Sequence, residues 1–132
     1  MYSAPRNGRE ATPHWQAARQ GILRLPFNSV TGAPAWPPSS APTNDGGTIE
    51  WRDCPTGGTI VSFSIVRRPV QPEWQDKAPY VVALIDLDAG IRMLSNIVDC
   101  DPETVAIGAR VQCQFVETTD PELGLPVFRL EG

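Results

Sequence analysis

Three cysteines and one histidine are the first residues in this 132-residue chain whose types could carry out chemistry. The cysteines are Cys54, Cys100 and Cys113, and no two of them have the Cys-x-x-Cys spacing of a metal knuckle or redox pair. None has a histidine or lysine beside it in sequence to lower the thiol pKa, so we predict inert thiols. The single histidine, His14, falls in the first turn of a predicted helix, and we expect it at the surface or in an interface.

Carboxylates form the second group with chemical potential. The members of this acidic zone are Asp86, Asp88, Asp99, Asp101 and Glu103. Such a group could supply an acid–base pair or bind a hard cation. The sequence favours a structural role, because Asp86 and Asp88 flank a turn and Asp101 is placed to cap a helical turn. We therefore predict no catalytic residue in this chain.

The composition narrows the classes of protein. The net charge is −4, and no basic run suggests a nucleic-acid surface, so we expect no nucleic-acid partner. We also expect no membrane segment, because no apolar run approaches about 20 residues, and no signal peptide. A cytoplasmic location follows as the default expectation. Fourteen prolines indicate a protein of strands and loops.

The N-terminal half contains two predicted parts. Residues 1–21 form an arm, expected to be mobile over residues 1–10, and a helix with Thr12 as N-cap and Gly21 at its end. Residues 22–57 have the turns of a small two-knuckle ribbon, with a strand at 48–54. Phe27, Val30 and Trp36 are expected to pack together there and to replace the stabilisation that a metal would give.

Residues 58–132 alternate as strands. In the strand at 59–68, Val61, Phe63 and Ile65 are expected to share one face. Further strands are predicted at 80–88, 90–98, 108–119 and 125–131, with Val111, Cys113 and Phe115 inward in the fourth. A proline-bearing loop is expected at 68–79. Five antiparallel strands with a short helical turn between the third and fourth predict a mainly β fold, a closed OB-fold barrel. A small open sandwich is the alternative.

This order of elements resembles a family of acyl-CoA-associated proteins with an N-terminal helix, a rubredoxin-like zinc ribbon and a C-terminal OB-fold. The resemblance covers most of the chain, and its strongest part is the run from Ala78 to Glu117. The segments that carry it are HWQAARQGILRL, Trp36-Pro37-Pro38, GTIVSFSIVRRP, APYVVALIDLDAGIRMLSNIVDCDPETVAIGARVQCQFVE and LPVFRL.

The ribbon departs from the family pattern. The four zinc-ligand positions that the resemblance implies fall near Asn28, Thr31, Pro42 and Asp45. None of these is a thiolate or an imidazole, whereas a structural zinc site needs four such donors. We therefore predict a degenerate ribbon without metal, and no cofactor.

Relatives in this family are mostly noncatalytic partners of thiolase-superfamily enzymes. The resemblance implies that this chain stabilises such a catalytic subunit and shapes its substrate entrance. The partner would bind most of an acyl-CoA and carry out acyl transfer, thiolysis or retro-aldol cleavage, including that of steroid side chains. A heterotetramer with two copies of each chain is expected. The helix and ribbon would supply much of the contact, and the predicted interface residues are Trp15, Phe27, Trp36, Pro37 and Trp74.

Three cations could meet the phosphates of coenzyme A. They are Arg67 and Arg68 at the end of a strand and Lys77 in the following loop. The simpler interpretation is that Arg67 and Arg68 are solvent-exposed charges at the end of a strand. Two further functions stay open: a stand-alone OB-fold module for acyl-CoA, and one for single-stranded nucleic acid.

Overall fold

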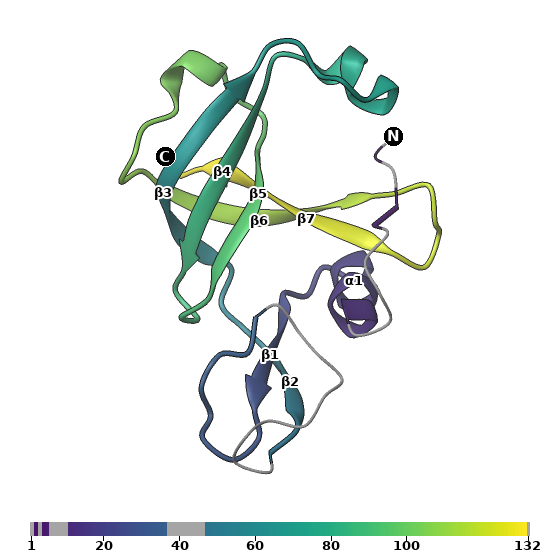
Figure 1. Ribbon diagram of the computed structural model, residues 1–132, viewed down its shortest axis with the longest axis vertical. Coiled ribbons are helices and arrows are strands. Elements are labelled where there is room, and N and C mark those ends of the chain that lie inside the picture. The colour runs from purple at the N-terminus through teal and green to yellow at the C-terminus, as the bar shows by residue number, and fades with distance from the viewer. Residues whose placement is uncertain (1, 3, 6–10, 37–46, 132) are drawn as a thin grey trace. The chain divides into compact units, whose positions relative to one another are not determined.

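The structure is a computed structural model that describes residues 2, 4–5, 11–36 and 47–131 (Figure 1). It contains two compact units. One unit holds the N-terminal helix, the ribbon and residues 115–125; the other holds residue 2, residues 56–114 and the C-terminal residues from 126. No helix among the described residues is long and apolar enough to cross a membrane.

The first unit is built on helix α1 (Thr12–Arg19) and a two-stranded antiparallel sheet. The helix begins one residue earlier than predicted, because Ala11 and not Thr12 occupies the N-cap position and offers no side-chain cap. It ends at Arg19, one residue earlier than predicted, with Gln20 at the C-cap position. Gly21 follows the cap, and its φ of 79° is the left-handed conformation that glycine tolerates. Strand β1 (Arg24–Asn28) pairs with β2 (Ile49–Asp53), which confirms the predicted strand at 48–54.

The start of strand β7 (Gly124–Leu130) packs closely on α1 within this unit. A Cβ atom added to Gly124 would lie 2.6 Å from the backbone N of Arg19 and 2.8 Å from the carbonyl carbon of Ala18. A side chain therefore has no room at this position, and glycine permits the close approach of helix and strand. Arg19 also forms an ion pair with Glu117 at 3.7 Å.

The chain forms a closed five-stranded barrel, as predicted. Most of the barrel belongs to the second unit, while residues 115–117 and 124–125 at the ends of two strands belong to the first. The strands run in the order β3-β4-β5-β7-β6. Their bounds are β3 (Gly57–Val66), β4 (Tyr80–Leu87), β5 (Arg92–Ile97), β6 (Arg110–Glu117) and β7 (Gly124–Leu130). The expectation that all strands are antiparallel is wrong at one place, because β5 and β7 pair in parallel at Ile97 and Phe128.

Alternation along the strands fills the barrel interior. Val81, Ala83, Ile85 and Leu87 of β4 are all buried, because successive side chains of a strand point to opposite faces. The predicted face of β3 is only partly correct. A register shift between Ile60 and Ser62 places a bulge at Val61, so Ile60 is the fully buried residue while Val61 is half-buried.

Two short 3-10 helices complete the barrel unit. η2 (Pro72–Lys77) lies within the segment that was predicted to be an irregular loop. η3 (Pro102–Thr104) is the predicted helical turn, and Asp101 caps it by accepting a hydrogen bond of 3.0 Å from the Glu103 backbone N–H. The local capping signal was therefore confirmed at Asp101.

Candidate functional site

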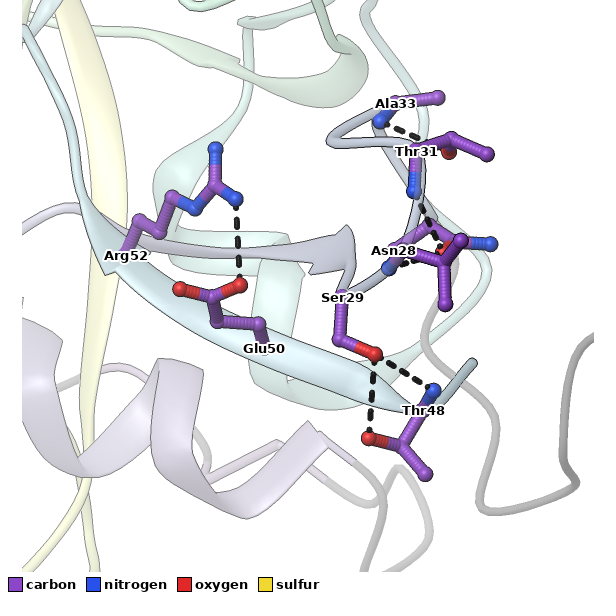
Figure 2. Close-up of polar contacts among 8 residues, drawn as sticks. Asn28, Ser29, Thr31, Ala33, Thr48, Glu50 and Arg52 are labelled. Atoms are coloured by element: carbon purple, nitrogen blue, oxygen red, sulfur yellow. Dashed lines mark hydrogen bonds and ion pairs between the residues drawn. The ribbon is translucent and has the colours of Figure 1, made fainter. Parts of the chain in front are cut away.

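The first knuckle of the ribbon is closed by hydrogen bonds of two side chains (Figure 2). The Asn28 Oδ1 atom accepts bonds from the backbone N–H groups of Val30 at 2.8 Å and Thr31 at 3.1 Å. The Thr31 hydroxyl accepts a third bond, from the Ala33 N–H at 3.2 Å. These are Asx-type and Ser/Thr-type turns, in which a short polar side chain satisfies nearby backbone donors.

A second set of contacts fastens the start of β2. The Ser29 Oγ atom accepts a bond of 2.9 Å from the Thr48 N–H, and the Ser29 N–H donates to the Thr48 carbonyl at 2.9 Å. On β2 itself, Arg52 donates to Glu50 at 3.1 Å, as Figure 2 shows. Polar side chains of the ribbon therefore join the two sides of the knuckle.

These contacts bear on whether the ribbon could hold zinc. The side-chain oxygens of Asn28 and Thr31, the first two former ligand positions, already accept backbone hydrogen bonds. Pro42 and Asp45 lie outside the described residues. No group of three or more His, Cys, Asp or Glu side chains that could hold a metal occurs in the described ranges. The described donor set does not fit a zinc site.

The structure places His14 differently from the prediction. We expected it at the surface or in an interface, but it is only 1% exposed in the structure. Its Nδ1 lies 2.8 Å from the Arg24 carbonyl oxygen, and its ring lies 4.5 Å from that of Trp15 and 5.0 Å from that of Trp36. Burial lowers the pKa of His14, and the bond to the Arg24 carbonyl opposes this only in part.

The predicted interface residues occupy different environments. Trp15 and Trp36 are half-buried around His14, and Trp74 is half-buried in the barrel unit. Phe27 is only 7% exposed and has the Arg52 guanidinium 5.0 Å from its ring centroid, so it has little surface to give a partner. Pro37 lies outside the described residues, and the interface assignment as a whole stays a prediction.

Val30 is an apolar residue whose position we predicted wrongly. It was expected to pack with Phe27 and Trp36, but it is 62% exposed. The signal was present in the sequence, because an Asx turn that starts at Asn28 puts the side chain two residues later at the tip of the turn. Val30 is thus an exposed apolar side chain at the tip of this turn.

The acidic zone is engaged in structural contacts. Asp86 accepts two hydrogen bonds from Arg92, at 2.7 and 3.1 Å, and Asp88 accepts two from Arg110, both at 2.8 Å. These guanidinium contacts lower the pKa of both carboxyl groups. Asp99 accepts a bond of 2.9 Å from Gln114. The structural role that the sequence favoured is supported at each of these positions.

The three cations that were considered for coenzyme A have separate surroundings. Arg67 forms an ion pair with Glu103 of the acidic zone, and Arg68 is exposed. Lys77 is half-buried and lies over two aromatic rings, 5.2 Å from the ring centroid of Tyr2 and 5.6 Å from that of Trp74. Their assignment to phosphates stays a prediction.

A pocket in the barrel unit adjoins Lys77. Its volume is about 190 Å³, and it lies where the β3–β4 segment meets the start of β4 and the end of β5. We name it the aromatic pocket, after Tyr2, Trp74 and Tyr80 in its wall. Sequence reasoning missed it, because its residues come from positions 2 to 102 and no local pattern connects them.

Two of the three thiols, those of Cys54 and Cys113, have raised pKa values. Burial raises the pKa of Cys113 to about 12, and burial followed by the nearby Asp53 charge raises the pKa of Cys54. A thiol is nucleophilic as the thiolate, so these two groups are poor nucleophiles at neutral pH.

Comparison with known proteins places these features in a family. Residues 51–116 match the family described as "ChsH2, C-terminal OB-fold domain". A DUF35 domain-containing scaffold protein of Methanothermobacter thermautotrophicus is 47% identical over 58 residues, which are 44% of this chain and 43% of that protein. The 3-oxo-4,17-pregnadiene-20-carboxyl-CoA hydratase alpha subunit of Mycobacterium tuberculosis is 29% identical over 117 residues, which are 88% of this chain and 37% of that protein. The chain thus spans less than half the length of these curated relatives.

A solved structure is similar over nearly the whole chain. The match is a chain of the Ltp2-ChsH2(DUF35) aldolase, with a TM-score of 0.83 and 30% sequence identity. It covers 96% of this chain and 98% of the other, so the likeness includes the N-terminal helix and the ribbon as well as the barrel.

Proposed function

Because the chain belongs to the ChsH2 (DUF35) family of OB-fold proteins, we propose that it is a noncatalytic accessory subunit of a thiolase-superfamily enzyme acting on an acyl-CoA thioester. The observation that carries this proposal is the likeness, over 96% of its length, to a chain of an aldolase named for two components. The scaffold name of the archaeal relative supports the same role. The engaged carboxylates and the poorly nucleophilic thiols support a chain without catalytic residues.

The partner would carry out the chemistry. This chain would stabilise the catalytic subunit and shape the entrance for the acyl group, in an assembly of two copies of each chain. The pregnadiene-carboxyl-CoA in the name of the mycobacterial relative favours a steroid side-chain thioester as the substrate class. Arg67, Arg68 and Lys77 remain candidates for contacts with the phosphates of coenzyme A.

The interface would include the ribbon. Trp15, Trp36 and Trp74 remain proposed contacts, and we add Val30, an apolar side chain 62% exposed at a turn tip of the ribbon. Phe27, which is mostly buried, would act by supporting the turn. Tryptophan and other large side chains are enriched among residues that dominate binding energy.

The decisive experiment is affinity purification of the chain with its bound partners. The chain carries an affinity tag in its native cells, and the proteins retained at moderate salt are identified and quantified by mass spectrometry. We expect a thiolase-like protein in near-equal amount, and acyl-CoA cleavage by that partner that depends on this chain. Recovery of the chain alone, or acyl-CoA cleavage by the purified chain alone, would refute the proposal.

A pair of variants tests the ribbon contact. Val30→Asp places a charge at an exposed position, so the fold should hold while the complex weakens at least tenfold. Val70→Asp is the matched control, because Val70 is 93% exposed in the barrel unit and is not part of the ribbon. Equal effects of the two substitutions on complex formation would remove the ribbon from the interface.

A further inference from the structure

The aromatic pocket has the walls of a site for a flat ring. The rings of Trp74 and Tyr80 pack with centroids 4.7 Å apart and planes tilted by 37°, and the ring of Tyr2 meets Trp74 edge-on at 5.9 Å. An engineered apolar cavity of about 150 Å³ is known to accept benzene. The volume of about 190 Å³ therefore suits a fused two-ring system rather than a long acyl chain.

The polar groups in the wall fit a heteroaromatic ring better than a hydrocarbon. Asn96 donates one N–H of its Nδ2 to the Val81 carbonyl at 2.9 Å, which orients the amide and leaves its Oδ1 as an acceptor. Asp99 uses one carboxylate oxygen, Oδ2, for the bond from Gln114 and retains the other. Two acceptors in an aromatic pocket are suited to an exocyclic amine, the donor that adenine presents.

Asp99 is held in an unusual conformation. Its φ of 60° lies in the left-handed region, which few non-glycine residues adopt, although aspartate is among those that do. The bond from Gln114 on β6 fixes its carboxylate. Such conformations are frequent at ligand sites because the surrounding contacts position a side chain that would otherwise relax.

A positive charge completes the site. The Lys77 ammonium lies over the rings of Tyr2 and Trp74, and its neighbour in sequence, Asp76, is 3.7 Å from it. An ammonium at the rim of an aromatic pocket is suited to the phosphate of a ligand whose ring stacks inside. The Asp99 carboxylate repels phosphate, so the base would face Asp99 and Asn96 while the phosphates face Lys77.

The place of the pocket in the barrel agrees with the way this architecture binds ligands. Oligonucleotides and oligosaccharides bind OB-folds on the second and third strands and on the loop between the first two. In this chain these elements are β4, β5 and the β3–β4 segment with η2, and all three contribute to the pocket. The pocket therefore lies at the surface that this barrel offers to planar ligands.

We propose that the aromatic pocket binds the adenine ring of an adenine nucleotide, with Lys77 at its phosphates. This inference rests on the proposed function for its choice of nucleotide, since coenzyme A carries an adenosine 3′-phosphate at the end opposite its thioester. The pocket would hold that end, while the acyl group extends to the catalytic partner.

Calorimetric titration of the full chain tests the site with parts of the ligand. The probes are coenzyme A, adenosine 3′,5′-bisphosphate, 4′-phosphopantetheine and GDP. We expect the first two to bind with dissociation constants within threefold of each other, and phosphopantetheine to show no binding up to millimolar concentration. Binding of phosphopantetheine without the bisphosphate, binding of GDP as tightly as the bisphosphate, or binding of neither would overturn the proposal.

Two variants and a spectroscopic measurement locate the binding. Lys77→Met should weaken adenosine 3′,5′-bisphosphate binding about tenfold, whereas Val70→Ala, in the same loop and outside the pocket, should leave it unchanged. In the wild-type chain, NMR shifts of the Trp74 indole and Asn96 amide should move on titration, a result that needs no variant to fold. Shifts confined to other residues would refute this location.

The outcomes separate this inference from the proposed function. If the chain forms its complex with a thiolase-like partner but no adenine nucleotide binds the pocket, the inference fails and the accessory role stands. If the bisphosphate binds but no such partner exists, the pocket stands and the accessory role fails. Tight binding of a thymidine oligonucleotide, exceeding that of the bisphosphate, would replace both with a single-stranded nucleic-acid function.

Discussion

Acidification should destabilise the unit that contains α1 and the ribbon, because its buried histidine cannot easily take up a proton. The Arg24 carbonyl can only accept a hydrogen bond, so Nδ1 of His14 carries the proton and Nε2 does not. Nε2 is buried and has no hydrogen-bond partner among the described residues. Protonation would therefore create a buried cation whose new N–H has no acceptor.

The size of the effect follows from proton linkage. The folded-state pKa of His14 is lower than its ordinary value of 6.5, so the unfolded chain binds more protons between these two values. The stabilisation is fully present above about pH 6.5 and is lost as the pH falls towards the lowered pKa. One such group loses at most about 1.4 kcal/mol per pH unit, so the loss between pH 6.5 and 5.0 is at most about 2 kcal/mol.

The assay is urea denaturation at pH 5.0 to 8.0, followed by tryptophan fluorescence. Trp15 and Trp36 adjoin the His14 ring and report on this unit. The chain has a single histidine, and contacts with arginine lower the pKa values of Asp86 and Asp88, so the titration of these two carboxyl groups falls in a more acidic range. His14→Gln retains a donor for the Arg24 carbonyl and should flatten the profile. A flat wild-type profile between pH 6.5 and 5.0, or an equal slope in the variant, would refute the reasoning.

Three further predictions concern single positions. Asn28→Ala removes the acceptor of two backbone N–H groups and should lower the free energy of unfolding of the ribbon by about 1 kcal/mol. Asn28→Asp keeps an acceptor oxygen and should retain most of the stability. Equal urea midpoints for the two variants would contradict this. Gly124→Ala should cost about 1–3 kcal/mol in thermal denaturation, because its Cβ would meet the Arg19 backbone, and an unchanged melting temperature would show that helix and strand separate easily. Iodoacetamide should label Cys113 more slowly than Cys100 at pH 8, because burial raises the Cys113 pKa to about 12; peptide mass spectrometry that finds equal rates would disprove the assigned burial.

Local signals in the sequence predicted most of the barrel. Met93 and Ile97 are buried on one side of β5, as the alternation of a strand indicates. Asp101 caps the turn two residues before the N–H that it satisfies. The bulge at Val61 and the parallel pairing of β5 with β7 depend on partner strands distant in sequence. No pattern within one strand reveals them.

The candidate sites were harder to predict for the same reason. A histidine in the first turn of a short helix has no local feature that buries it; the burial of His14 depends on β1 and on Trp36. Tyr2 belongs to an arm that we expected to be mobile, yet its ring contacts Trp74, which lies 72 residues later (74 − 2). The absence of zinc ligands stays a prediction, which depends only on the residue types at the four positions that the resemblance implies.

The amide of Asn28 gives the ribbon a chemistry different from that of a metal knuckle. A thiolate can be oxidised and its metal can be removed by a chelator, whereas an amide oxygen that accepts two N–H groups responds to neither treatment. Hydrolysis of this amide would yield a carboxylate that still accepts the same bonds. We therefore expect folding of this knuckle to be independent of the supply of zinc and of the redox state of its surroundings.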